Sequence, residues 1–270
     1  MHRWKPEEYH NSSSAQAEWA MDVISKIDIR GDERILDIGC GDGKITSELA
    51  TLVPEGSVAG IDCSEEMIRF AKSRFPQSMQ PNLEFQLGDA RSLGFIGEFD
   101  LVVSFACLHW VLDHIPVLEG IRRSLKPSGR IFLQFGGRGN AEAVVEIAEN
   151  MISSERWARY FEGFVFPYGF FGPEEYLGWL ESAGLMPVRV ELVPKDMVKE
   201  GIFDLASWIE TTWLPYIERV PDNLQREFIY EIAERYARAH PPDEEGRLHV
   251  KMMRLEVVAK NVSLEYYPKI

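Results

Sequence analysis

The chain has 270 residues, of which 45% are hydrophobic, so it can bury a substantial core and is not a mainly disordered protein. It contains no uncharged apolar run of about 18 residues, and its first residues lack the apolar stretch of a secretory signal peptide. The net charge of −14 disfavours binding to the phosphate backbone of a nucleic acid.

These features predict a cytoplasmic protein without a membrane or nucleic-acid partner. The three cysteines, Cys40, Cys63 and Cys107, are far apart in the sequence and form no C-x-x-C pair. We therefore expect reduced thiols that fill space, and neither a disulfide framework nor a bound metal.

Short apolar runs alternate with helical patterns through the first half of the chain, and this alternation predicts a parallel sheet covered by helices. The predicted strands are Arg34 to Ile38, Ser57 to Asp62, Leu83 to Leu87, Phe99 to Phe105 and Arg130 to Phe135. A turn is expected over 126–129. Ser64 is expected to cap the helix after the second strand, because the acidic residues that follow it suit the positive end of a helix dipole.

The second half of the chain has a different residue pattern. A glycine-rich loop at 136–140 precedes an aromatic-rich stretch from Trp157 to Trp179. Beyond it we predict a strand over Met186 to Val193, helices over Phe203 to Glu218 and Asp222 to Ala239, and a last strand over Leu248 to Lys260.

The strongest local pattern is Asp-Ile-Gly-Cys-Gly-Asp-Gly over residues 37–43, where a strand passes into a glycine-rich turn and then a helix. Glycines permit positive φ angles and let a ligand approach the main chain. A dinucleotide-binding loop needs a third glycine where Lys44 stands, so the pattern argues against a nicotinamide-dependent reductase.

Acids mark the ends of the next two strands. Asp62, 23 residues after Gly39, can accept hydrogen bonds from two ribose hydroxyls, and Asp89 follows the third strand. Ligands of such sheets bind outside the carboxyl ends of the strands, so Gly39, Asp62, Asp89 and Ser104 are expected to converge on one crevice. Each Asp alone is also typical of a helix cap or turn; together they favour a nucleoside pocket.

These segments, with Gly88-Asp89-Ala90 and with Phe99-Asp100-Leu101-Val102 ahead of Leu108-His109-Trp110, resemble the class I S-adenosylmethionine-dependent methyltransferases. The resemblance implies an α/β fold with a Rossmann-like, mostly parallel seven-stranded sheet in the order 3-2-1-4-5-7-6, its last strand antiparallel. It also implies S-adenosyl-L-methionine as cofactor and S-adenosyl-L-homocysteine as product. The cofactor-binding residues that it implies are Asp37, Gly39, Cys40, Gly41, Gly43, Asp62, Cys63, Met67, Asp89, Ala90 and Ser104.

In that family the glycine loop approaches the methionine end of the cofactor. The acid after the second strand, here Asp62, would hold the ribose, and the acid after the third, here Asp89, would contact the adenine amino group.

Segments near both ends of the chain resemble the trans-aconitate and juvenile-hormone-acid methyltransferase group, whose members esterify carboxylates. They are Trp4 to Tyr9, Ser14-Ala15-Gln16, Phe105 to Val111 and Trp213-Leu214-Pro215-Tyr216. The resemblance implies that Gln16 and Trp110 hold the acceptor carboxylate. The substrate-binding residues that we predict are Tyr9, Gln16, His109, Trp110 and Trp213.

A carboxylate is already ionised near neutral pH, so methyl transfer to it needs positioning and desolvation rather than a base. For a hydroxyl or amine acceptor, His109 is the candidate catalytic base, because it follows the fourth strand and histidine titrates in the useful range. An equally good interpretation is that His109 only packs against its neighbours or orients its loop. His114 is expected at the surface or at a helix start.

Arg138, Lys251 and Arg254 are the cations available to an acceptor with several carboxylates, whereas the many aromatic residues favour a partly apolar acid. We predict a single methyltransferase domain over residues 1–270. Its predicted parts are an N-terminal cover segment 1–30, a cofactor-binding core 31–137, helical cover insertions at about 138–182 and 195–245, and the final strand 248–260.

The predicted function is methyl transfer to a small organic acid by a monomer. The alternatives are C-, N- or phenolic O-methylation of a quinone-like or other small metabolite, and a non-catalytic S-adenosylmethionine-binding regulator.

Overall fold

The computed structural model describes residues 6–7 and 14–262, with side chains from residue 17 onward in the second of these ranges. The described chain forms two compact units. We call residues 14–138, 168–193 and 254–262 the sheet unit, and residues 139–167 and 194–253 the helical unit.

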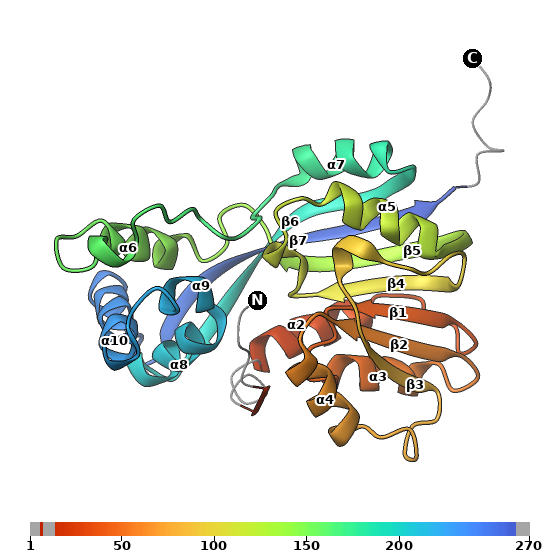
Figure 1. Cartoon of the computed structure of the whole chain (residues 1–270), viewed down its shortest axis with the longest axis horizontal. Coiled ribbons are helices and arrows are strands. Elements are labelled where there is room, and N and C mark those ends of the chain that lie inside the picture. Colours follow the sequence, from red (N-terminus) through yellow and green to blue (C-terminus); the bar gives the residue numbers. More distant parts are fainter. Residues whose placement is uncertain (1–5, 8–13, 263–270) are drawn as a thin grey trace. The chain divides into compact units, whose positions relative to one another are not determined.

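The sheet has seven strands in the order β3-β2-β1-β4-β5-β7-β6 (Figure 1). The strands are β1 (Arg34–Ile38), β2 (Ser57–Asp62), β3 (Leu83–Leu87), β4 (Phe99–Phe105), β5 (Leu125–Gly136), β6 (Leu185–Lys199) and β7 (Leu248–Asn261). The neighbours among β1 to β5 run parallel, and β7 runs antiparallel to β5. The predicted order and direction of the strands are therefore confirmed, and β1 to β4 have the predicted bounds.

The helices of the sheet unit are α2 (Ser14–Ile24), α3 (Lys44–Leu52), α4 (Glu65–Arg74), α5 (Ile115–Ser124) and α7 (Pro173–Ser182), with short 3-10 helices η1 (Ala90–Ser92) and η2 (Leu108–Trp110). The start of α4 follows the prediction, because the Ser64 hydroxyl accepts the backbone N–H of Met67 at 3.2 Å.

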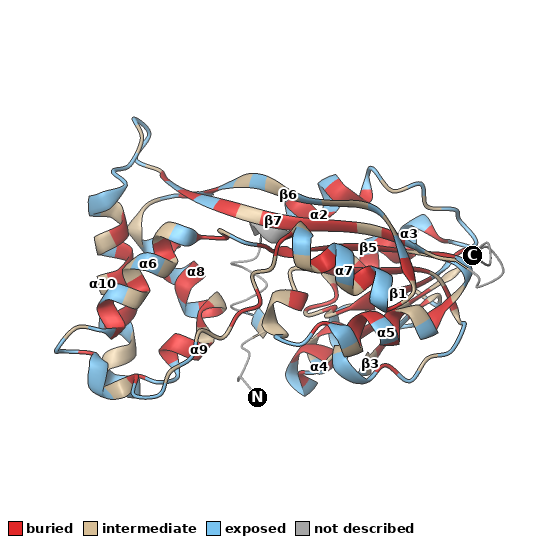
Figure 2. Ribbon diagram, turned by 90° about the horizontal axis from the view of Figure 1, so that it is seen from above, coloured by how far each residue is buried: buried red, intermediate tan, exposed pale blue. Residues whose placement is uncertain are grey.

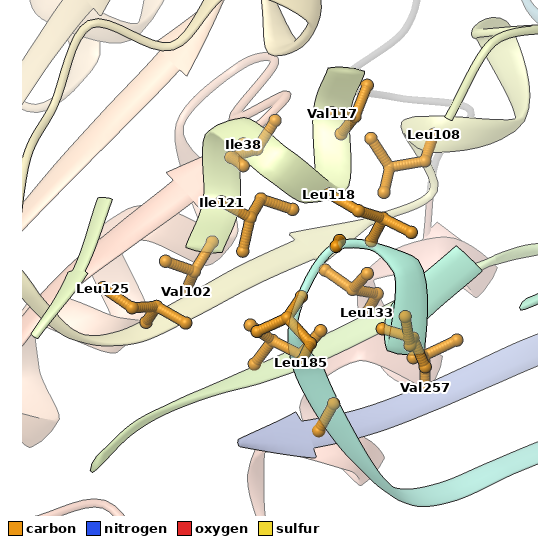
Figure 3. Close-up of a cluster of buried hydrophobic side chains, with 14 of the residues drawn as sticks. Ile38, Val102, Leu108, Val117, Leu118, Ile121, Leu125, Leu133, Leu185 and Val257 are labelled. Atoms are coloured by element: carbon orange, nitrogen blue, oxygen red, sulfur yellow. The ribbon is translucent and has the colours of Figure 1, made fainter. Parts of the chain in front are cut away.

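Two apolar cores lie on opposite faces of the sheet. Alternate residues of a strand point to opposite faces, and accordingly Ile35 belongs to the core with α2, α3 and α4, whereas Leu36 belongs to the core with α5 and α7. Figure 3 shows the second core, where Val117, Leu118 and Ile121 of α5 face the strands. The sheet is thus covered on both faces, and ligands of such sheets bind outside the carboxyl ends of the strands.

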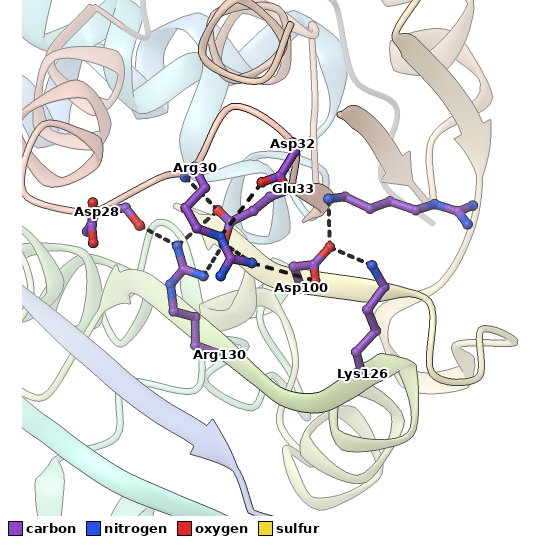
Figure 4. A network of polar contacts seen from close by, with 8 residues as sticks. Asp28, Arg30, Asp32, Glu33, Asp100, Lys126 and Arg130 are labelled. Carbon is purple, nitrogen blue, oxygen red and sulfur yellow. Dashed lines mark hydrogen bonds and ion pairs between the residues drawn. The ribbon is translucent and has the colours of Figure 1, made fainter. Parts of the chain in front are cut away.

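A polar network ties the amino-terminal ends of β1, β4 and β5 together (Figure 4). The fully buried carboxylate of Glu33 receives two guanidinium bonds from Arg130, at 2.5 and 3.0 Å. Asp100 accepts the Lys126 ammonium at 2.7 Å and the backbone N–H of Arg34 at 2.9 Å. These contacts fix the strand starts, opposite the carboxyl ends where ligands bind in this type of sheet.

The helical unit contains α6 (Glu142–Ile152), η3 (Ala158–Tyr160), α8 (Ile202–Thr212), α9 (Leu214–Ile217) and α10 (Asp222–Ala239). Buried residues form one stripe along α10, where Phe228, Ile232 and Tyr236 recur every fourth position (Figure 2). The Trp157 ring meets Phe228 edge to face at 5.0 Å. An aromatic core therefore holds this unit together.

Two predicted features were wrong in detail. The single helix over 203–218 is divided into α8 and α9 at Trp213, because Pro215 has no N–H to continue the bonding and its ring would clash with the carbonyl of Thr211. The turn over 126–129 lies within β5, where Ser128 has a φ of 65° and the register against β4 shifts.

Candidate cofactor and acceptor site

The glycine loop follows β1 directly. Gly39, Gly41 and Gly43 all have positive φ angles, and Gly43 precedes α3 as its N-cap. A Cβ atom at Gly39 would lie 2.2 Å from the sulfur of Cys107, so only glycine fits there. Cys107 follows β4, and the loop therefore lies between the carboxyl ends of β1 and β4, where the strand order reverses and ligands of such sheets bind.

Asp62, the last residue of β2, contacts this loop. Its Oδ2 atom accepts the backbone N–H of Gly41 at 3.0 Å, and its Oδ1 atom accepts that of Ser64 at 2.8 Å. Burial raises the pKa of the Asp62 carboxyl, while these backbone donors lower it. Asp62 thus holds the glycine loop to the start of α4.

Two further predicted cofactor residues are Asp37, near the end of β1, and Cys40, within the glycine loop. Asp37 is buried in β1, and its Oδ2 atom accepts the Thr46 hydroxyl at 2.7 Å. Burial raises the pKa of Asp37 to about 7. Burial also raises the pKa of the Cys40 thiol, with added repulsion from Asp37 and Asp62, so Cys40 stays a protonated thiol near neutral pH.

Asp89 caps the short helix η1, which begins at Ala90. Its carboxylate accepts the backbone N–H of Arg91 at 2.9 Å and pairs with the guanidinium of Arg91, which lowers the pKa of Asp89. Cys63 is exposed just after Asp62, and Met67 is buried in α4. Burial raises the pKa of the Cys63 thiol, with added repulsion from Asp62 and Asp89. The ends of β2 and β3 lie side by side, because Asp62 pairs with Leu87.

At the end of β4, the buried Ser104 hydroxyl donates to the carbonyl oxygen of Ile38 at 2.8 Å and so joins β4 to β1 beneath the loop. Two residues later, Ala106 has a φ of 51°, a left-handed conformation that costs a non-glycine residue energy and that often occurs at functional sites. The sequence offered no signal for this strained residue.

His109 lies in η2, just beyond β4. The backbone N–H of Gly136, at the end of β5, donates to its Nδ1 atom at a long 3.4 Å. Burial holds the pKa of His109 well below its usual value, with further contributions from the charges of Arg254 and His114. His109 is therefore a neutral imidazole near neutral pH.

Aromatic rings surround His109. The ring centroids of Trp110, Tyr168 and Phe170 lie 5.8, 6.1 and 6.0 Å from that of His109. The backbone N–H of Gly169 donates to the carbonyl oxygen of His109 at 2.8 Å, which joins the segment 168–170 to η2. His109 and Trp110 are predicted acceptor residues, whereas Tyr168 and Phe170 are predicted only as members of the aromatic-rich stretch from Trp157 to Trp179.

A buried cation lies beside His109. Arg254 of β7 is 3% exposed and pairs across the sheet with Gly136, whose N–H reaches His109. The Arg254 guanidinium carbon lies 5.6 Å from the ring centroid of Trp19 in α2. Among the three predicted cations, Arg254 is thus the one adjacent to His109 within the sheet unit.

The other predicted acceptor residues are placed differently. Tyr9 lies outside the described residues, and Gln16 occupies the first turn of α2 but its side chain is not described. Trp213 belongs to the helical unit, where it packs on Trp208 and Tyr216. The two remaining cations are both exposed: Arg138 pairs with Glu174 and Glu175, and Lys251 belongs to the helical unit.

His114 is the N-cap of α5, which is one of the two positions predicted for it, and it does not lie at the surface. Its side chain is 1% exposed, its Nδ1 atom is hydrogen-bonded to the Tyr176 hydroxyl, and its Nε2 atom is 2.8 Å from the carbonyl oxygen of Val111. Burial lowers the pKa of His114 to about 4. Tyr176 lies 62 residues away in the sequence, so a local pattern could not indicate this pair.

The arrangement fits the cofactor that the resemblance implies. Each Asp62 oxygen accepts one of the two described N–H bonds and has a second lone pair for a ribose hydroxyl. The glycine loop presents its main chain to the same edge of the sheet, and Asp89 follows the neighbouring strand. Asp62, the glycine loop and Asp89 would hold the ribose, methionine and adenine parts of S-adenosylmethionine.

Within residues 6–7 and 14–262, no set of three or more His, Cys, Asp or Glu side chains is arranged to hold a metal ion. In the same part of the chain, none of the helices combines the length and the apolar character needed to cross a membrane.

Comparison with known proteins agrees with this geometry. Residues 35–129 match a family described as a methyltransferase domain. The chain is 29% identical to a trans-aconitate 2-methyltransferase of Mycolicibacterium gilvum over 262 residues, which cover 95% of this chain and 98% of that protein.

Solved structures share the fold. The YcgJ protein from Bacillus subtilis has a TM-score of 0.61 at 18% identity, covering 92% of this chain and 99% of that one. The geranyl diphosphate C-methyltransferase from Streptomyces coelicolor A3(2) has a TM-score of 0.53 at 18% identity, covering 94% and 82%. The chain therefore carries a class I S-adenosylmethionine-dependent methyltransferase domain, similar in sequence to the trans-aconitate 2-methyltransferases.

Proposed function

We propose that the protein methylates a carboxylate oxygen of a small organic acid. S-adenosylmethionine supplies an electrophilic methyl group on a positively charged sulfur. In the transfer, a carboxylate oxygen of the acceptor forms a bond to the methyl carbon while the S–C bond breaks and its electron pair stays on sulfur. The products are a methyl ester and S-adenosylhomocysteine, and no proton is released.

The protonation of His109 carries this proposal. A neutral imidazole whose Nδ1 atom accepts the Gly136 N–H must carry its proton on Nε2, so it has no lone pair left for a proton from the acceptor. Its depressed pKa also makes it a weak base. A carboxylate is already ionised near neutral pH, so it can attack the methyl group without a base to remove a proton from it.

The remaining work of the protein is positioning and exclusion of water. Asp62 and the glycine loop orient the cofactor, because the Gly41 N–H bond holds them in one arrangement. The rings of Trp110, Tyr168 and Phe170 shield the acceptor side, where loss of water makes a carboxylate more reactive.

The similarity to trans-aconitate 2-methyltransferases supports an acid as the acceptor. Methylation at carbon is the second candidate, because the fold is also that of a geranyl diphosphate C-methyltransferase. N- or phenolic O-methylation and a non-catalytic cofactor-binding regulator are the remaining alternatives, since a fold alone does not select the acceptor.

The test is incubation of the purified protein with S-adenosylmethionine and a panel of acceptors: trans-aconitate, aliphatic monocarboxylic acids, amines and phenols. Mass spectrometry identifies methylated products, and mild alkali distinguishes a hydrolysable ester from stable C- or N-methyl products. We expect alkali-labile product from acids alone. An alkali-stable product, or cofactor binding without any product, would move the assignment to one of the alternatives.

We further propose a cytoplasmic monomer that acts on a small molecule and not on a nucleic acid. The net charge of −14 supports the last point, because it repels a polyanionic backbone. The helical unit, with the N-terminal segment, is proposed as the cover of the predicted single domain.

A further inference from the structure

His114 joins two parts of the sheet unit that are far apart in the sequence. It is the N-cap of α5 and is 1% exposed. Its Nε2 atom lies 2.8 Å from the carbonyl oxygen of Val111, and its Nδ1 atom is hydrogen-bonded to the hydroxyl of Tyr176 in α7. One side chain therefore connects the end of η2 with α7.

These two bonds fix where the proton of the imidazole lies. A carbonyl oxygen only accepts, so Nε2 must carry the proton and donate it to Val111. Burial lowers the pKa of His114 to about 4, so the ring is neutral near neutral pH and Nδ1 keeps a lone pair for the Tyr176 hydroxyl. Because Tyr176 is fully buried, an apolar residue in place of His114 would leave its hydroxyl without an acceptor.

The two parts that His114 joins carry the aromatic rings of the proposed acceptor side. Val111 closes η2, because its N–H donates to the carbonyl oxygen of Leu108 at 2.9 Å, and η2 contains His109 and Trp110. The segment 168–170, whose aromatic rings flank His109, leads into α7. The linkage thus reaches both sides of the proposed acceptor position.

The two sides also touch each other through their main chains. The backbone N–H of Gly169 donates to the carbonyl oxygen of His109 at 2.8 Å. A Cβ atom at Gly169 would lie 2.6 Å from the carbonyl oxygen of Val111, the same atom that accepts from His114. Close-packed main chains cannot shift independently, so the spacing between η2 and the segment 168–170 depends on where His114 holds Val111.

From this geometry we infer that His114 and Tyr176 are positioning residues for the methyl acceptor, because together they set the spacing between η2 and the segment 168–170. The inference rests on the proposed placement of the acceptor beside these rings. Methyl transfer needs close alignment, and a misplacement of about 1 Å can cost about 100-fold in rate. The contacts described above do not include the glycine loop, so acceptor turnover should change without a change in cofactor affinity.

The kinetic test compares the wild type with Tyr176→Phe, His114→Phe and His114→Gln. The readouts are kcat/KM for the acid of the panel that is methylated fastest, and S-adenosylhomocysteine affinity by calorimetry. We expect kcat/KM to fall about 3- to 10-fold in Tyr176→Phe, as for one lost hydrogen bond, and about 10- to 100-fold in His114→Phe. His114→Gln keeps a donor and an acceptor and should recover part of that loss. Cofactor affinity should be unchanged in all three variants.

The double variant tests whether the two residues act together. Because the Tyr176 hydroxyl acts through the imidazole, His114→Phe combined with Tyr176→Phe should be no worse than His114→Phe alone. The matched control is Ser124→Ala, which removes a buried 2.8 Å bond to the carbonyl oxygen of Gly120 at the other end of α5. It should leave kcat/KM unchanged.

Hydrogen exchange followed by mass spectrometry tests the linkage without any reaction. In protein saturated with S-adenosylhomocysteine, the N–H groups of Trp110, Val111 and Gly169 are hydrogen-bonded within η2 or between η2 and the segment 168–170. We expect them to exchange about 10-fold faster in His114→Phe than in the wild type or in Ser124→Ala, because the linkage no longer holds the two sides together.

The outcomes separate this inference from the proposed esterification. If acids are methylated but the His114 and Tyr176 variants match the wild type in kcat/KM, the positioning role is wrong and the esterification stands. Equal losses of kcat/KM and of cofactor affinity would also overturn the inference, because they indicate a general loss of structure. If the wild type methylates no acid but exchange accelerates in His114→Phe as expected, the linkage stands and the proposed esterification fails.

Discussion

The carboxylate of Asp62 accepts the backbone N–H of Gly41 at 3.0 Å, so the acid that ends β2 holds the loop that follows β1. Asp62→Ala removes this bond and the proposed ribose acceptor together. We expect S-adenosylhomocysteine to bind about 10- to 100-fold more weakly, as for the loss of hydrogen bonds to a charged group. Isothermal titration calorimetry measures this directly.

Glu48→Ala is the matched control for that experiment, because Glu48 is an exposed acid on the neighbouring helix α3. It should bind S-adenosylhomocysteine like the wild type. Equal affinities of Asp62→Ala and the wild type would show that Asp62 supports the loop without contacting the cofactor.

Asp37 should make stability depend on pH. Its pKa is about 7 in the folded protein and near 3.8 when unfolded, so between these values the folded state binds the additional proton. The free energy of unfolding therefore falls as pH rises from about 4 to about 7, by up to about 4 kcal/mol from this group. Asp37→Asn, which can still accept the Thr46 hydroxyl, should abolish this part of the slope.

The measurement is urea unfolding of the cofactor-free protein at several pH values, read as the difference between wild type and variant. Asp32→Asn is the control, because Asp32 is exposed and its removal should leave the slope unchanged. A wild-type slope that persists in Asp37→Asn would mean that other groups cause it.

The part of the fold that could be predicted is local in sequence. Strands β1 to β4 are short apolar runs. Glycine or alanine follows β1, β3 and β4, and Asp62 is the last residue of β2, so the sequence marks these strand ends and places the glycine loop and Asp62 at two of them. The strand order came from a family resemblance. The break at Trp213 was missed although Pro215 signalled it, because the apolar pattern continued across the proline.

The rest depends on contacts between distant residues. His114 packs against Phe171 and Tyr176, which come from a distant segment of the chain. The position of Arg254 comes from the pairing of β5 with β7. The strain at Ala106 has no sequence signature, since alanine rarely adopts a positive φ. The cofactor residues could thus be predicted better than the acceptor residues.

His109 distinguishes the proposed esterification from base-assisted transfer. A catalytic base contributes about 10²- to 10⁴-fold, whereas loss of a packing or positioning side chain should cost less than about 10-fold in kcat. For His109→Gln we expect such a modest fall, with a higher KM for the acid. Burial holds the pKa of His109 well below its usual value, so His109 stays neutral from pH 6.5 to 8.5. The pH profile of kcat over this range should therefore have the same shape in His109→Gln as in the wild type.

Steady-state kinetics over that pH range test this expectation, with S-adenosylhomocysteine affinity as the check on folding. A loss of kcat beyond about 100-fold, together with loss of a titration step present in the wild type, would instead identify His109 as the base.

The buried ion pair of Glu33 and Arg130 should stabilise the strand starts. Arg130→Met leaves the fully buried Glu33 carboxylate with weaker partners, such as Arg30 at 3.4 Å, and should lower the free energy of unfolding by about 3 kcal/mol in urea. Adding Glu33→Gln should recover part of that loss, because the uncompensated charge is gone. The surface pair of Lys26 with Asp22 is the control, and Lys26→Met should cost less than about 1 kcal/mol. An equally small cost for Arg130→Met would mean that water reaches Glu33 in solution and that the network contributes little to the sheet.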